Sequence, residues 1–221
     1  MKLEPGRLTL TDYVSENWID IVNDAILHVR VTLIAMVIAA IIGIGIAVAT
    51  YRRPALASFA TSMTGAFLTI PSLALLAILI VPFGLGLTAV LIALVLYALL
   101  PITRNAIVGL RAVDPAVVDA GRGMGMNRNR LLWRVRLPLA WPVILAGIRV
   151  STLMIIGIAA IGAYVRGPGL GNQIFAGLAN FGSANALNQV LIGTFGIMIL
   201  ALLFDLLFVV IGKVTTSRGI R

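Results

Sequence analysis

The sequence predicts an all-α integral membrane protein with about five transmembrane helices. Of its 221 residues, 60% are hydrophobic and 11% are charged, whereas soluble domains have about 45–50% apolar and about 25% charged residues. The apolar residues gather in five runs of roughly the length that crosses a bilayer. Backbone groups in lipid must be hydrogen-bonded within the segment, so runs this apolar are predicted to be helices rather than open strands.

The chain begins with a polar, mainly acidic segment, residues 1–24, which we expect outside the cell. Its acidity and length are not typical of a signal peptide. Residues 25–213 are expected to form a single transmembrane domain, and residues 214–221 a cytoplasmic tail. The predicted helices are residues 31–51, 59–81, 85–102, 139–165 and 190–212. A turn containing proline and glycine at 82–86 separates the second and third helices.

Basic residues set the predicted orientation. They follow the first helix, fill the segment between the third and fourth helices, and end the chain. They are Arg52, Arg53, Arg104, Arg111, Arg122, Arg128, Arg130, Arg134, Arg136, Lys213, Arg218 and Arg221. With five helices all three groups fall on one side, which the positive-inside rule makes cytoplasmic. The N-terminus is therefore predicted to lie outside the cell and the C-terminus inside. Because the basic residues lie in short segments between apolar runs, they also argue against a nucleic-acid partner.

Several kinds of chemistry are excluded by composition. The chain has no cysteine and a single histidine, His28, so no disulfide, thiolate site, histidine zinc site or catalytic triad can be assembled. No GxxxxGK[ST] phosphate-binding loop is present. We therefore expect no catalytic residue, metal or cofactor in this chain, and any ATP hydrolysis must take place in another subunit.

Two opposite charges lie within apolar runs. Arg149 and Asp205 are both expected roughly 12–17 Å from the cytoplasmic ends of their helices. A lone charge in lipid is costly, so similar depth and opposite sign favour an Arg149–Asp205 ion pair. The alternative is that one of them lines a permeation pathway.

A second set of polar and helix-breaking residues marks a possible pathway or gate. Prolines in the second and third helices each remove a backbone hydrogen bond and favour a kink. The polar residues near them either satisfy the freed carbonyl groups or flank a transport pathway. The set is Thr69, Pro71, Ser72, Tyr97, Pro101 and Tyr164.

Two water-facing segments remain. The predicted outer loop, residues 166–189, has an apolar pattern that predicts a short amphipathic helix, suited to an outer gate or a docking surface. The central loop, residues 114–138, begins with Asp114-Pro115, a typical helix start. Glycines at 121, 123 and 125 are expected to end this helix, and Asn127 or Asn129 to cap a second short helix. A helix of small side chains permits close approach by a partner protein, whereas an ordinary basic loop would hold anionic headgroups.

The central loop resembles the EAA motif of permease subunits of bacterial ABC importers. The matching residues are Asp119, Ala120, Gly121, Gly125, Val135, Leu137 and Pro138, with the family's spacing. The resemblance implies a type I importer permease fold in which this loop is a coupling helix, seated on a cytoplasmic ATPase subunit. Asp119 replaces the usual Glu and Gly121 replaces the second Ala; the added glycine is expected to make the helix end more flexible.

Four further segments, 69–77, 97–115, 123–126 and 137–149, resemble permeases for osmoprotectants such as glycine betaine, carnitine, choline and proline betaine. The resemblance implies a multi-pass protein of the bacterial cell membrane. Its implied partners are ATPase subunits that bind ATP and magnesium, a second permease (identical or a related paralogue), an extracytoplasmic substrate-binding protein and membrane lipid. The segment 162–171 departs from the branch by carrying Arg166 in its glycine-rich element.

Two alternatives stay open. An importer for methionine or another small amino acid would belong to the same family. A secondary transporter or channel subunit would belong to another class, and would be expected to show an inverted repeat or paired intramembrane carboxylates, whereas Asp205 stands alone.

Overall fold

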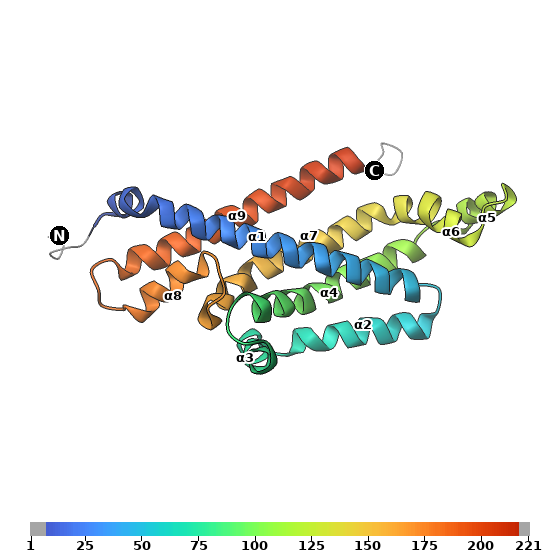
Figure 1. Ribbon diagram of the computed structural model, residues 1–221. Helices are drawn as coiled ribbons and strands as arrows, with labels where there is room; N and C mark the ends of the chain where they lie inside the picture. Colours follow the sequence, from blue (N-terminus) through green and yellow to red (C-terminus); the bar gives the residue numbers. More distant parts are fainter. Residues whose placement is uncertain (1–7, 217–221) are drawn as a thin grey trace. The chain divides into compact units, whose positions relative to one another are not determined.

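The computed structural model describes residues 8–216, and every regular element in that range is a helix (Figure 1). The elements are α1 (Leu10–Thr50), α2 (Pro54–Thr69), α3 (Ser72–Phe83), α4 (Leu87–Arg111), α5 (Pro115–Gly123), α6 (Arg128–Leu131), η1 (Leu132–Arg136), α7 (Leu137–Ile161), η2 (Gly162–Val165), α8 (Gly171–Ala179) and α9 (Ala186–Thr215). η1 is a π-helix and η2 is a 3₁₀-helix. Arg218 and Arg221 of the predicted basic tail, and residues 1–7 of the acidic segment, lie outside the described residues.

The helices agree with the predicted all-α membrane architecture. Within the described range, four are long and apolar enough to cross a bilayer: α1, α4, the continuous helix over 128–165, and α9. The bent pair α2 and α3 supplies a fifth span if it is counted as one.

The predicted second helix, residues 59–81, is wrong as a single element. It divides at Ile70-Pro71 into α2 and α3, whose axes differ by 97°. Pro71 lacks a backbone N–H and disfavours the helical conformation for the residue before it. Its own backbone is extended, with φ −57° and ψ 138°. Proline here ends one helix and starts the next, which is a stronger effect than the expected kink.

The first helix begins much earlier than the apolar run. Thr9 caps α1, because its Oγ1 accepts a hydrogen bond from the backbone N–H of Asp12 at 3.2 Å. The polar residues that follow are therefore helical and continuous with the span. A helix of 41 residues is about 60 Å long, which is more than a bilayer requires.

The chain folds into two compact units, each assembled from three separate segments. The first contains residues up to 35, 70–95 and 153–204, and its core includes Leu94, Ile155 and Ile156. The second contains residues 36–69, 96–152 and those from 205 onward, with Ile102 and Ile144 among its fully buried side chains.

In the first unit, the predicted short helix of the 166–189 loop is α8. The Nε2 atom of Gln173 donates a hydrogen bond to Asp24 of α1 at 2.8 Å. Gly169, at φ +128°, passes so close to His28 that an added Cβ would lie 2.7 Å from the Nδ1 atom of that histidine. Arg166 takes the left-handed conformation, φ 61°, at the end of η2. An arginine thus stands where glycine would be unstrained.

Candidate functional site

The first helix of the central loop starts as its sequence predicts. The side chain of Asp114 accepts a hydrogen bond from the backbone N–H of Ala116 at 2.8 Å. Pro115 occupies the first helical position, where its missing N–H removes no hydrogen bond. These two residues fix where α5 begins.

The same helix ends at Gly123, among the three glycines that were expected to end it. Gly121 lies inside α5 instead of ending it, and the chain turns at Gly125, which has φ +79°. The backbone N–H of Gly125 donates to the carbonyl of Arg122 at 2.9 Å, and that of Met126 donates to the carbonyl of Gly121 at 3.1 Å. These two bonds form a Schellman cap, in which the left-handed position favours glycine. The spacing from Asp119 to Gly125 therefore reflects a helix of fixed length.

Gly121 packs closely against the following helix, and the expected flexibility of the helix end stays a prediction. It is buried in α5, and an added Cβ would lie 2.7 Å from Cδ1 of Leu131 in α6. The absence of a side chain lets α5 pack closely against the following helix. Glycine at this position therefore leaves room for the side chain of Leu131.

A small apolar core holds the central loop together. Val113, Val118 and Leu131 are buried, and Met126, Val135 and Leu139 pack against them. The opposite face of α5 is exposed and consists mainly of small or apolar side chains. The exposed residues of α5 are Pro115, Ala116, Val117, Asp119, Ala120, Arg122 and Gly123, and Met124, which follows the helix, has 71% of its surface accessible. Asp119 forms an exposed ion pair with Arg122 at 2.9 Å. α5 therefore presents a surface of mostly small or apolar side chains that carries one exposed ion pair.

Leu137 and Pro138 lie where the central loop joins α7. Asn127, rather than Asn129, caps α6 by accepting a hydrogen bond from the backbone N–H of Arg130 at 2.8 Å. The helix then widens into the π-turn η1, closed by a bond from Leu137 N–H to the carbonyl of Leu132. In a regular α-helix the ring of Pro138 would collide with the carbonyl of Arg134. The wider turn avoids that collision.

We expect Gly125→Ala to weaken the end of α5. Alanine in the left-handed conformation costs about 1 kcal/mol, so local opening of residues 115–126 should be easier by about that amount, measured by amide hydrogen exchange. Gly123→Ala is the matched control, because Gly123 is helical and an added Cβ meets nothing within 4 Å. Alanine there should protect the segment or leave it unchanged. Equal effects of the two substitutions would contradict the proposed role of the positive φ.

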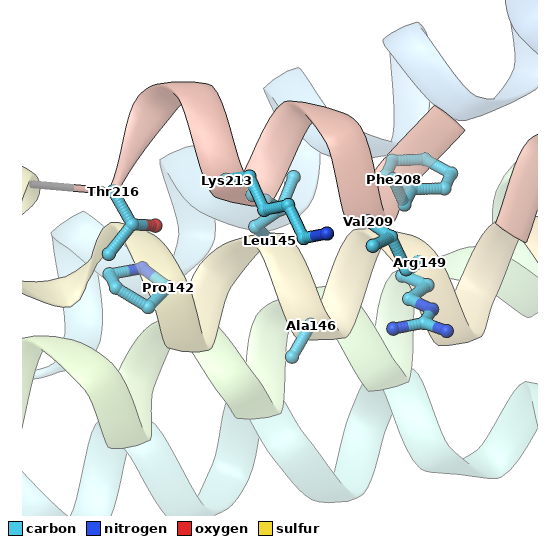
Figure 2. A pocket seen from close by; sticks show the side chains of 9 residues that line it. Pro142, Leu145, Ala146, Arg149, Phe208, Val209, Lys213 and Thr216 are labelled. Carbon is cyan, nitrogen blue, oxygen red and sulfur yellow. The ribbon is translucent and has the colours of Figure 1, made fainter. Parts of the chain in front are cut away.

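The structure brings the two intramembrane charges together. Nε and NH2 of Arg149 in α7 donate to the two carboxylate oxygens of Asp205 in α9, at 2.6 and 2.7 Å. The side chains retain 41% and 35% of their accessible surface. Arg149 also lines a groove of about 380 Å³ between α7 and α9, along which the side chain of Lys213 extends (Figure 2). The bidentate geometry matches guanidinium to carboxylate and keeps both charges compensated.

The residues predicted for a pathway or gate are divided between the two units. Thr69, Tyr97 and Pro101 belong to the second unit, and Tyr97 is buried. Pro71, Ser72 and Tyr164 belong to the first. Tyr164 is mostly exposed and its ring lies 5.9 Å from that of Phe175 in α8. A common pathway through all six remains a prediction.

Residues 21–216 match the protein family described as binding-protein-dependent transport system inner membrane component. The glycine betaine/carnitine/choline transport system permease protein OpuCD of Bacillus subtilis (strain 168) is 38% identical, over 89% of this chain and 85% of that protein. The carnitine transport permease protein OpuCD of Listeria monocytogenes serotype 1/2a (strain 10403S) is 36% identical, over 90% and 87%. The osmoprotectant import permease protein OsmW of Salmonella typhimurium (strain LT2) is 36% identical, over 88% and 91%.

The fold is similar to a solved structure of the MetNI methionine ABC transporter in an inward-facing conformation. The TM-score is 0.76, and the match covers 89% of this chain and 96% of that one at 23% identity. A similarity at this level of identity establishes the fold. The predicted type I importer permease fold is thereby confirmed.

Proposed function

The chain belongs to the family of inner membrane components of binding-protein-dependent transport systems, and from this premise we propose that it is the permease subunit of an ATP-driven importer of quaternary-ammonium osmoprotectants. The observation that carries the substrate class is the 36–38% identity, along nearly the whole chain, to permeases named for glycine betaine, carnitine, choline and osmoprotectant transport. Proline betaine has the same chemistry and is included. The protein spans the cell membrane several times and takes part in transport.

The exposed face of α5 is the surface we assign to an ATPase partner. A rigid helix with small side chains can enter a cleft and transmit movement without deforming. Asp119, Ala120 and Gly121 lie on this helix, and Gly125, Val135, Leu137 and Pro138 fix its end and its junction with α7. ATP and magnesium are bound by that partner, in keeping with the absence of a phosphate-binding loop from this sequence.

The assembly we propose contains two permeases, either identical or paralogous, two ATPase subunits and an extracytoplasmic substrate-binding protein. Closure of the ATPase subunits around ATP moves the coupling helices, and the permeases switch between inward-open and outward-open states. The binding protein contributes most of the substrate affinity.

The two alternatives are weaker. A methionine importer has only the shared fold in its favour, at 23% identity. A secondary transporter or channel subunit does not fit membership of a family of binding-protein-dependent components.

Uptake by the reconstituted importer tests the proposal. The permease is placed in proteoliposomes with its ATPase subunit, its binding protein and internal ATP, and labelled glycine betaine, carnitine, choline, proline and methionine are supplied in turn. We expect ATP-dependent uptake of one or more quaternary-ammonium solutes and none of methionine. Uptake of methionine alone would replace the proposed substrate class, and uptake without ATP would overturn the proposed energy source.

A further inference from the structure

Within the second unit, five arginines line one cavity of about 640 Å³ beside the end of α1. They are Arg52, Arg111, Arg122, Arg128 and Arg136. The cavity lies among segments predicted to be cytoplasmic, at the level where the apolar part of α1 ends. Its lining is mainly polar, in contrast to the helices that lead to it.

Three of these arginines meet on a single buried tyrosine, and we call Arg52, Arg111 and Arg136 around Tyr51 the arginine cluster. Tyr51 is only 4% exposed. Nε of Arg52 donates to its hydroxyl oxygen and Nε of Arg111 to its backbone carbonyl, each at 2.7 Å. The guanidinium carbons of Arg52 and Arg136 lie 5.3 and 5.5 Å from the ring centroid. The tyrosine thus holds three positive charges close together, where they repel one another unless an anion is bound.

The described residues give the arginine cluster no anion. Its hydrogen bonds go to the neutral oxygens of Tyr51 and, for Arg136, to the carbonyl of Leu110 at 2.9 Å. The nearby carboxylate of Asp119 is already paired with Arg122. A guanidinium group carries five N–H donors, and each of these bonds uses one nitrogen. Most donors of the cluster therefore remain available to a ligand with several acceptor oxygens, such as a phosphate group.

An apolar groove of about 580 Å³ is lined by residues that neighbour those of the arginine cluster in the sequence. It is lined by α1 and by the segment from η1 to α7. Ile44 and Val48 of α1 line the groove, and Arg52, in the turn that follows the end of α1 at Thr50, lines the basic cavity. Arg52 comes four positions after Val48, and Arg136 of the cavity directly precedes Leu137 of the groove, so the linings of the two cavities follow each other along the chain. The other side of the groove carries Trp133 and Trp141, a residue type enriched where lipid tails meet headgroups.

We propose that this face binds one anionic phospholipid, with the phosphate group held by the arginine cluster and an acyl chain in the apolar groove. Carboxylates of a partner protein would match the arginines but would leave the adjoining apolar groove without an explanation. A free phosphate would likewise leave the apolar groove without an explanation. The inference does not rest on the proposed substrate or on the ATPase partner, because the site is formed within this chain.

Native mass spectrometry of the purified permease in detergent tests the proposal, with phosphatidylglycerol or phosphatidylcholine added. The unaltered chain should retain phosphatidylglycerol in preference to phosphatidylcholine. Each arginine near a membrane surface contributes about five-fold to binding of an anionic lipid, so Arg52→Gln should weaken retention about five-fold and Arg52→Gln/Arg136→Gln roughly 25-fold. The controls are Arg53→Gln and Arg53→Gln/Arg134→Gln, which remove the same charge from exposed positions outside both cavities. They should weaken retention less than the matched variants of the cluster.

A second variant tests the groove without touching an arginine. Gly45 lines the groove, and an added Cβ meets nothing within 4 Å, so Gly45→Leu fills the groove while leaving the fold intact. It should reduce lipid retention several-fold. Gly157→Leu is its control, since position 157 is equally open and lies outside the groove.

Three outcomes would overturn the assignment. They are equal retention of the two lipids, equal loss in the arginine variants and their controls, and displacement of the lipid by inorganic phosphate at similar concentration. A change in oligomeric state in Gly45→Leu without a change in lipid retention would assign the groove to a second copy of the chain instead. None of these results depends on transport, so they are distinguishable from a failure of the proposed function.

Discussion

Asp205→Ala is expected to remove most of the folded protein from the membrane, on the order of a tenfold loss. The substitution leaves the guanidinium group of Arg149 within an apolar helix without the carboxylate that now holds it at 2.6 Å. An uncompensated charge in lipid must be hydrated or drawn to the surface, and either change disturbs the packing of α7 against α9. The measurement is the yield of monodisperse protein extracted from membranes.

Companion variants separate pairing from other roles. Arg149→Ala should cause a similar loss, and the exchange Arg149→Asp/Asp205→Arg should restore much of the yield. Asp119→Ala is the matched control, because Asp119 forms an ion pair of similar length with Arg122, but in water, where such pairs contribute little. If the exchange restores nothing, pairing is not what the fold requires, and the alternative that one charge lines the pathway gains support.

The parts of the fold that could be predicted depend on neighbouring residues or on position along a single helix. The spans follow from the length of the apolar runs, and the start of α5 follows from Asp114-Pro115. Arg149 and Asp205 could be matched because each lies at a similar distance from the end of its own run. In these cases the relevant physics, namely burial in lipid, helix capping and charge compensation, acts within a helix or along its axis.

The parts that could not be predicted depend on which distant segments meet. Pro71 indicates a break, but the 97° bend depends on how the backbone on both sides packs. Gly121 is explained only by the position of Leu131. The arginine cluster joins Tyr51 to Arg111, 60 positions away in the sequence. The Tyr-Arg-Arg sequence at the end of the first apolar run was its only local signal.

The Thr9–Asp12 cap, by contrast, could have been predicted from the sequence. A threonine followed three residues later by an acidic residue is a recognisable helix start, and it precedes the first apolar run by many residues. Polarity made the segment resemble a tail, although the capping pattern already indicated that α1 begins there. Capping chemistry is thus the better guide to where a membrane helix starts, because hydropathy reports only the part that lies in lipid.

Ala120→Arg is expected to lower association with the ATPase subunit at least tenfold while leaving the permease folded. Ala120 is exposed on α5, away from the small core formed by Val113, Val118 and Leu131. A long charged side chain there prevents close approach of a partner to the helix, and the lost contact area and buried charge both oppose binding. The measurement is co-purification of the ATPase subunit and ATP hydrolysis stimulated by substrate in proteoliposomes.

Val214→Arg is the control for the added charge. Val214 is 79% exposed near the end of α9, on the side predicted to be cytoplasmic but outside the central loop. A general effect of positive charge on assembly would lower association equally in both variants, whereas the proposed docking surface requires a loss confined to Ala120→Arg.

Normal association and stimulated hydrolysis in Ala120→Arg would show that α5 is not the surface through which ATP drives transport. A loss of binding with unchanged hydrogen exchange in residues 115–126 would separate contact with the partner from stability of the helix, because the capping bonds at Asp114 and Gly125 are left in place.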